Sequence, residues 1–457
     1  MAAVSPISGA AFEKLGSTTS QEVGSTKSIW SLHTWCERNN MVVKPLDSIF
    51  TKEHLMYTQV WVSLQYLIYL DSTSIISEPV LKYHREKKTN VFKTVLEDRD
   101  WIGQITSQLR HKEEDDFTKP IQDLLSQTLQ LRSPQVVNLG LTDRNLYSLA
   151  YSLMFNNAKF LVEDLLQVLE VSLSSWINET QDHVLTHGRA PLLIGREMNN
   201  YRDRIQYYRL KIKDLRFKAS AAGQLGSFCE LYSTNGGFDH EELQDGFIRG
   251  VLGLDTIQYS AVQPHGDTWA EFLRYVEGVA LVLSDLGEFL KYLSTRELIT
   301  GSSEVKSGNL AQRAIIDLTQ VTTYHGNFIP RGSLGSMLYG TVNTSLLESF
   351  KHQMSYFSKG CHSILDFLNG FKCSKPSVPD LSSLILIPLE VYVRINNVPN
   401  GVGQLNQFRQ TNPAWPSKDS VAVLIDSLKI PAEEKARFKR MKPLEVLKTG
   451  QRFISGS

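Results

Sequence analysis

Apolar residues recur every three or four positions between residues 269 and 293. This spacing places them on one face of an α-helix, because successive turns bring such positions into line. A helix with one long apolar face needs partner helices to cover that face in water. The stripe therefore predicts a long core helix with the inward side chains Trp269, Phe272, Leu273, Val276, Val279, Ala280, Leu283, Leu286, Leu290 and Leu293.

Similar patterns predict helices along most of the chain. The segments concerned are 29–70, 78–132, 146–170 and beyond, 194–218, 310–323 and 334–368. Runs in which apolar and polar residues alternate, which are typical of half-buried strands, are rare. The sequence therefore predicts an all-α protein with several unusually long central helices.

The length and two breaks in the helical pattern predict more than one domain. A chain of 457 residues is too long for one compact core, so two or three domains are expected. Ser133-Pro134 interrupts the helical pattern, and the Pro- and Ser-containing run 375–380 precedes a proline-rich tail. Within that tail, 431–440 has proline at the start and basic residues at the end, which predicts a short helix.

Charge and cysteine content exclude several classes of protein. Lys+Arg and Asp+Glu are both 48, so no net basic field attracts nucleic acid or anionic lipid. The four cysteines lie far apart and form no CxxC pair, which argues against zinc ribbons and a disulfide framework. We find no secretory signal and no apolar stretch of membrane-spanning length, so a cytoplasmic protein is expected.

Three connections between predicted helices carry candidate chemistry. The first is the small, hydroxyl-bearing run 301–309, which is either a catalytic loop or a plain surface connection. The second is Thr186-His187-Gly188-Arg189, between two long helices. In the third, Thr142 or Asp143 is expected to cap the helix that follows. No GxGxxG or GxxxxGK[ST] motif is present, so these nucleotide-binding loops are absent.

Four segments, in this order along the chain, resemble the bacterial-type adenylosuccinate lyases of the fumarase/aspartase superfamily. The first is similar to that family's opening AVSPVDGRY, the second to CTSEDINNLxxALM, the third to THGQPATPxTxGKExAN and the fourth to LPEEEKARLKxMTP. In this sequence they are 3–9 (AVSPISG), 141–154 (LTDRNLYSLAYSLM), 186–200 (THGRAPLLIGREMNN) and 431–443 (PAEEKARFKRMKP).

The resemblance implies an all-α, three-domain subunit with a central bundle of long helices. We expect an N-terminal helical domain over 1–140, the bundle over 141–370 and a small C-terminal helical domain over 371–457. The family forms homotetramers in which each active site combines three subunits. It binds a small-molecule substrate, without metal or cofactor, and releases fumarate by β-elimination through a base and an acid.

The resemblance also assigns candidate residues. His187 matches the family's general acid or its helper, and Ser303 matches the catalytic base in the family's GSS motif. Binding roles are expected for the remaining matched or neighbouring positions, with Lys306 as a substitute for the family's loop lysine. These positions are His111, Thr142, Asp143, Thr186, Arg189, Ser302, Lys306 and Arg331.

This sequence differs from the family's motifs at several positions whose side chains bind anions in the family. The family's GSSxMPxKxNP loop is shortened, because Gly301-Ser302-Ser303 is followed almost directly by 308–310 (GNL). The family's N-terminal Arg and Tyr, the Gln after THG and an Arg in its DSTVLRN segment are replaced. Since charged bidentate groups hold phosphate and carboxylate, these losses predict a substrate that is smaller or less anionic than adenylosuccinate.

Three functions remain open at this point. The first is a diverged lyase-type enzyme that uses His187 and Ser303 for proton transfer on a new substrate. The second is a catalytically inactive protein of the same fold that acts as a structural partner, in which His187 and Ser303 are a structural histidine and a loop or cap serine. The third is a genuine adenylosuccinate lyase. The sequence names neither the substrate nor the type of proton transfer.

Overall fold

The computed structural model describes residues 46–73, 118–129, 131, 133–187, 190–223, 239–257, 266–301, 306–328, 344–376, 381–412 and 416–448. All structural statements below concern these residues. The helices predicted within 29–45, 78–117 and 334–343 lie outside them.

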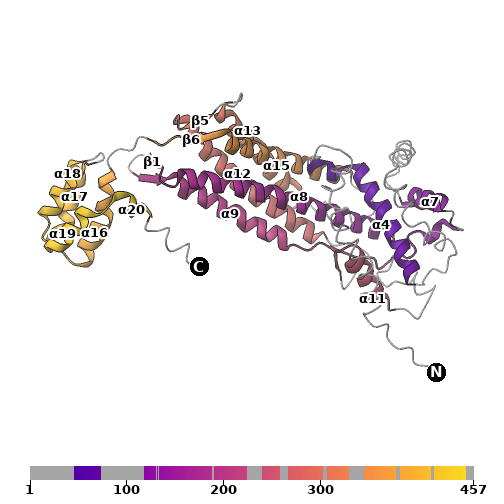
Figure 1. The fold of residues 1–457 in the computed structure, drawn as a ribbon. Coiled ribbons are helices and arrows are strands. Elements are labelled where there is room, and N and C mark those ends of the chain that lie inside the picture. The colour runs from indigo at the N-terminus through magenta and orange to yellow at the C-terminus, as the bar shows by residue number, and fades with distance from the viewer. Residues whose placement is uncertain are drawn as a thin grey trace, which may run out of the picture. The chain divides into compact units, whose positions relative to one another are not determined.

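Helices dominate the described residues, as Figure 1 shows, and the prediction of an all-α protein is confirmed. The helices before the central bundle are η1 (Leu46–Phe50), α4 (Lys52–Ser72), α7 (Thr118–Leu129) and η2 (Pro134–Val136). The long helices are α8 (Asp143–Thr180), α9 (Ile194–Asp214), α12 (Asp267–Thr295), α13 (Ser307–Phe328) and α15 (Thr344–Gly370). Between α9 and α12 lie the short helix α11 (His240–Asp245) and a π-helix, η3 (Gly246–Val251).

Six short strands join the ends of these helices in pairs. β1 (Val184–His187) and β2 (Ala190–Leu193) form an antiparallel hairpin between α8 and α9. β3 (Lys218–Ala219) and β4 (Asp255–Thr256) pair in parallel. β5 (Ile299–Gly301) follows α12 and pairs antiparallel with β6 (Phe371–Cys373), which follows α15. The helix predicted over 194–218 is shorter than expected, because α9 ends at Asp214 and Lys218 belongs to β3.

The chain divides into two compact units, and the long helices contribute to both. Unit 1 comprises Met1–Leu169, Ile205–Asp285 and Arg313–Ile364, and unit 2 comprises Glu170–Arg204, Leu286–Gln312 and Leu365–Ser457. The three-domain division with boundaries near 140 and 370 stays a prediction.

The core of unit 1 is centred on Phe155 of α8. Its ring contacts five others at centroid distances of 5.0 to 6.0 Å, and these belong to η1, the segment after α9, the start of α12 and α15. The five are Phe50, Phe217, Trp269, Phe272 and Phe350. Aromatic rings bury large apolar areas and favour tilted contacts, so this cluster fixes where the long helices meet.

In unit 2 a hydrogen bond joins two of the long helices. The Trp176 indole Nε1 donates to the Leu368 carbonyl at 2.7 Å, which ties the end of α8 to the end of α15. Gly195 lies so close to the chain near Gln181 that an added Cβ would lie 2.7 Å from the Gln181 Cα. The turn between α8 and α9 is therefore tightly packed.

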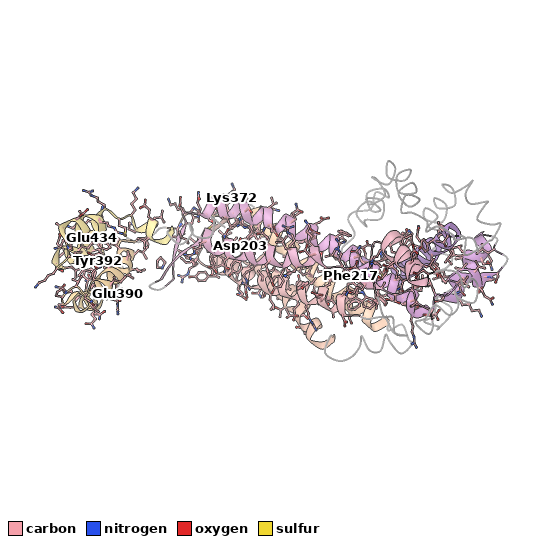
Figure 2. All side chains as sticks on the ribbon, turned by 90° about the horizontal axis from the view of Figure 1, so that it is seen from below. Asp203, Phe217, Lys372, Glu390, Tyr392 and Glu434 are labelled. Atoms are coloured by element: carbon pink, nitrogen blue, oxygen red, sulfur yellow. The ribbon has the colours of Figure 1, made fainter. Side chains whose placement is uncertain are left out.

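The C-terminal part of unit 2 has a small core of its own. It is built from η5 (Leu381–Ile385), α16 (Leu386–Ile395), α17 (Gly401–Thr411), α18 (Lys418–Ser427), α19 (Ala432–Arg440) and α20 (Pro443–Lys448). Tyr392 meets Phe438 edge-on at 5.5 Å. The guanidinium groups of Arg394 and Arg409 bind Glu390 and lower its pKa (Figure 2 labels Glu390 and Tyr392). α19 begins directly after Pro431, so the predicted short helix is confirmed.

Candidate functional site

The structure describes part of the candidate set. Thr142, Asp143 and Lys306 are described with their side chains, whereas Thr186 and His187 are described only as backbone in β1. His111, Arg189, Ser302, Ser303 and Arg331 lie outside the described residues. The roles assigned to all of these residues therefore stay predictions.

Thr142 caps α8 through a reciprocal pair of hydrogen bonds. Its Oγ1 accepts from the Asn145 backbone N–H at 3.2 Å, and Asn145 Oδ1 accepts from the Thr142 N–H at 3.1 Å. This is the geometry of a capping box, in which the first and fourth residues satisfy each other's backbone donors. The sequence predicted either Thr142 or Asp143 as the cap, and Thr142 forms it.

Asn145 extends this cap into a buried network in unit 1. Its Nδ2 donates to the Ser220 carbonyl at 3.3 Å, and its Oδ1 accepts from the Gly223 N–H at 3.2 Å. Gln244 of α11 accepts from the Ala221 N–H at 2.9 Å, so the segment 220–223 is held from two sides. Asn145 is not among the residues predicted from the sequence; its place three residues after a capping Thr is the signal that would have identified it.

The hydroxyl of Thr142 both accepts and donates a hydrogen bond within this network, because it also donates to Asn145 Oδ1 at 2.9 Å. The N–H of Asn145 in the first turn is bonded to Thr142 Oγ1, so the attraction of this helix end for a ligand comes from the helix dipole, which favours a negative charge. Asp143 in the same turn carries a carboxylate of its own and would partly oppose a second one.

His187 is the last residue of β1, so the β1–β2 hairpin fixes where its backbone lies. His187 pairs with Ala190, so only Gly188 and Arg189 connect the two strands. Behind the hairpin, the Ile194 N–H donates to the His183 carbonyl at 2.9 Å, which closes its base where α9 begins. Thr186 and His187 therefore end the first strand of a short hairpin, between the two long helices that the sequence predicted around them.

His183 is a second histidine of this segment that the sequence analysis did not single out. Burial, followed by the neighbouring Lys375 ammonium, lowers the pKa of its imidazole. Its Nδ1 is buried without a hydrogen-bond partner among the residues that the structure describes. His183 is therefore neutral near pH 7 and serves as a structural comparison for His187.

The connection that holds Ser302 and Ser303 starts from a tightly fixed strand. Gly301 pairs with Phe371, and a Cβ added at Gly301 would lie 2.5 Å from the Gly370 carbonyl oxygen and 2.6 Å from the Phe371 ring. Only glycine fits such a close approach. At the other end, the exposed Lys306 directly precedes α13, and its carbonyl accepts from the Asn309 N–H at 2.9 Å. Both ends of the short connection are thus held in place.

No cluster of three or more His, Cys, Asp or Glu arranged to hold a metal occurs within the described ranges. The half-buried Cys373 of β6 lies beside the Gly301 strand, and burial raises the pKa of its thiol to about 11. A protonated thiol is a weak nucleophile, so Cys373 is a poor candidate for nucleophilic chemistry. A search of the described helices for membrane-spanning segments found none with enough length and apolar character.

Comparisons with known proteins agree on the fold. Adenylosuccinate lyase of Buchnera aphidicola subsp. Acyrthosiphon pisum (strain APS) is 20% identical over 348 residues, which cover 70% of this chain and 74% of that protein. The β-carboxy-cis,cis-muconate cycloisomerase structure from Acinetobacter calcoaceticus sp. ADP1 matches with a TM-score of 0.63 at 12% identity, covering 90% of this chain and 97% of the other. No family model matches the sequence.

Two further structures agree. Fumarate lyase from Mesorhizobium sp. BNC1 has a TM-score of 0.61 at 12% identity, covering 88% of this chain and 96% of the other. The 3-carboxy-cis,cis-muconate lactonizing enzyme from Pseudomonas putida has a TM-score of 0.63 at 14% identity, covering 90% and 95%. The chain therefore has the fold of the fumarase/aspartase superfamily of lyases, and the resemblance read from its sequence is confirmed at that level.

Gly301 offers a direct test of how the candidate loop is anchored. We expect Gly301→Ala to lower the free energy of unfolding by about 1–3 kcal/mol, because the added methyl group overlaps the Gly370 carbonyl. Urea unfolding followed by circular dichroism measures this change. Gly308→Ala, in the first turn of α13 just after the connection, is the control: its nearest new neighbour is the Ser294 Cβ at 4.0 Å, and no loss is expected. Equal stability of the two variants would contradict this anchoring.

Proposed function

We propose that this protein is a diverged lyase-type enzyme that carries out acid/base chemistry on a small molecule. Its substrate is smaller or less anionic than adenylosuccinate. The proposal rests on which of the family's motifs this chain keeps and which it replaces, within a fold that is confirmed. The motifs Thr186-His187-Gly188 and Gly301-Ser302-Ser303 are kept, whereas the charged groups expected to hold a phosphorylated dicarboxylate are replaced.

Each retained group has one role in the proposed reaction. Ser303 takes a proton from the carbon beside a carboxylate, and His187 protonates the leaving nitrogen or oxygen. Negative charge then develops on the carboxylate and needs nearby donors. The first turn of α8, capped by Thr142, is our candidate for this role, with Lys306 as a cationic neighbour of the serine loop.

The proposal requires several copies of the chain in one site. α8 is one continuous helix of 38 residues, about 57 Å long at 1.5 Å per residue, and it separates Thr142 from the His187 hairpin. We therefore propose a homotetramer with composite sites. Large apolar side chains that are 44% to 66% exposed on the long helices support such an assembly, since burying them between copies would remove apolar surface from water. They are Phe160, Val168, Val171, Tyr207, Leu210, Leu281 and Ile316.

The short serine loop favours a second candidate. Only five residues separate the end of β5 at Gly301 from Ser307 at the start of α13. A loop of this length lacks the Met-Pro and Asn-Pro elements of the family's loop. This observation favours a catalytically inactive protein that associates with a complete lyase through the same bundle.

A substrate comparison separates the candidates. We expect the purified protein to interconvert 3-carboxy-cis,cis-muconate and its lactone, which are smaller and carry fewer negative charges than adenylosuccinate, and to release no fumarate from adenylosuccinate. Opening of the lactone is the elimination described above, with the ring oxygen as the leaving group. In lactone formation the same steps run in reverse: a carboxylate oxygen adds to the double bond and the carbon beside the other carboxylate gains the proton. Ultraviolet absorbance follows the first reaction, and an enzymatic fumarate assay follows the second. Fumarate release at the rate of an intact adenylosuccinate lyase would contradict the proposed change of substrate. A folded oligomer that converts neither compound would favour the inactive candidate.

Two substitutions test the assigned roles on any activity found. We expect His187→Gln and Ser303→Ala each to lower kcat by about 10²–10⁴-fold, the usual contribution of a general acid or base. His183→Gln, on the same hairpin segment, and Ser307→Ala, at the start of α13, are the matched controls and should keep turnover near that of the unmodified protein. The assignment is wrong if both test variants turn over at full rate.

A further inference from the structure

One side of α16, labelled in Figure 1, carries large apolar side chains that are exposed to solvent. Ile387, Val391 and Ile395 follow one another at intervals of four residues, which places them along one line of the helix. They are 54%, 51% and 73% exposed. We call these three residues the outer line of α16. The opposite side of the helix is buried in the small C-terminal core and holds Leu386, Leu389 and Val393.

The two charged residues of α16 are paired with each other beside the outer line. Arg394 donates two hydrogen bonds to Glu390 Oε1, from Nε at 3.0 Å and from Nη2 at 2.8 Å. Arg409 of α17 lies 2.7 Å from Glu390 Oε2. The remaining eight residues of α16 are all uncharged. A helix that is apolar on both sides is typical of one that is covered on both sides.

The outer line is complementary in shape to a second copy of itself. Ile387 and Ile395 lie at equal distances along the helix from Val391. An antiparallel copy therefore places each Ile387 opposite the other copy's Ile395, and the two Val391 side chains opposite each other. Reciprocal contacts of this kind are the mark of an interface with twofold symmetry.

The charges beside the outer line favour the antiparallel arrangement. Glu390 and Arg394 lie on the same flank of the line, because they are one helical turn apart. A twofold axis across the helices brings these flanks together in reverse order, with Glu390 about 3 Å along the axis from the other copy's Arg394. A parallel copy would instead place like charges together, which disfavours a contact.

We propose that the outer line of α16 is a contact surface for a second copy of this chain, in which two α16 helices pack antiparallel about Val391. Three side chains form a smaller patch than the roughly 800 Å² per partner of a standard interface, so the contact is weak by itself. It is distinct from the association of the long helices proposed above. It also does not depend on the chain being an enzyme.

Cross-linking of introduced cysteines tests this contact in the full-length protein. A short bis-maleimide joins two thiols only where they lie close together, and denaturing gels then show joined pairs of chains. We expect Val391→Cys to form such pairs about tenfold faster than Val423→Cys, because the contact raises the effective concentration of one Val391 position near the other. Val423 is the matched control, since it is a valine of α18 that is 70% exposed.

Two further positions test the direction of the helices. We expect the double variant Ile387→Cys/Ile395→Cys to form pairs about tenfold faster than either single variant, because position 387 of one copy faces position 395 of the other. In the single variants the two introduced cysteines are about 12 Å apart along the helix axis, at 1.5 Å per residue. The unmodified protein gives the background rate of the native cysteines, and circular dichroism checks that each variant is folded.

Two results would overturn the proposal. Equal cross-linking rates of folded Val391→Cys and Val423→Cys would contradict the contact between copies. A single variant Ile387→Cys that forms pairs as fast as the double variant would contradict the antiparallel arrangement. Neither measurement uses enzymatic activity, so failure of this contact is distinguishable from failure of the proposed function.

Discussion

The packing of aromatic rings around Phe155 is the interaction on which the rest of unit 1 depends. This one side chain of α8 joins η1, the segment after α9, α12 and α15 through five ring contacts. Interior packing is dense and transmits displacements, so the positions of these elements are coupled. The first turn of α8, which Thr142 caps, belongs to the same continuous helix as Phe155 and is therefore positioned together with this core.

The described candidate residues lie at the ends of the long helices. Thr142 and Asn145 hold the first turn of α8, a short hairpin presents the His187 backbone, and Gly301 fixes the strand from which the serine loop begins. Solved structures with 12% to 14% identity share the fold, because helix packing depends on the spacing of apolar residues more than on their identity. In the proposed function, substrate choice depends on a few charged residues in the connections, where this chain differs from the family's motifs.

The sequence predicted the long helices well, since their period extends over many turns. The stripe from Trp269 to Leu293 corresponds to α12, Asp267–Thr295. Strands of two to four residues are too short to show a period, so β3 was read as the end of α9. Contacts between segments that are far apart in the sequence also cannot be predicted from the spacing of residues. Asn145 meets Ser220 across 75 residues, and Gly301 meets Gly370 only after β5 and β6 pair.

For the candidate site, the sequence predicted a cap at Thr142 or Asp143, and in the structure Thr142 forms it. Motif matching supplied His187 and Ser303, whose side chains lie outside the described part of the chain. In the proposed site their chemistry depends on groups brought together from separate segments and separate copies, which no spacing along one chain reveals. The acid and base roles therefore rest on resemblance and await the substitutions.

Association of several copies is the feature on which the proposed function depends most, because a 38-residue helix separates the two ends that carry candidate groups. The most direct measurement is the molar mass of the purified protein by size-exclusion chromatography with light scattering. One chain has a mass of 51.7 kDa, and a particle of four times that mass is predicted. A folded monomer that persists at high protein concentration would contradict the composite site and the function proposed from it.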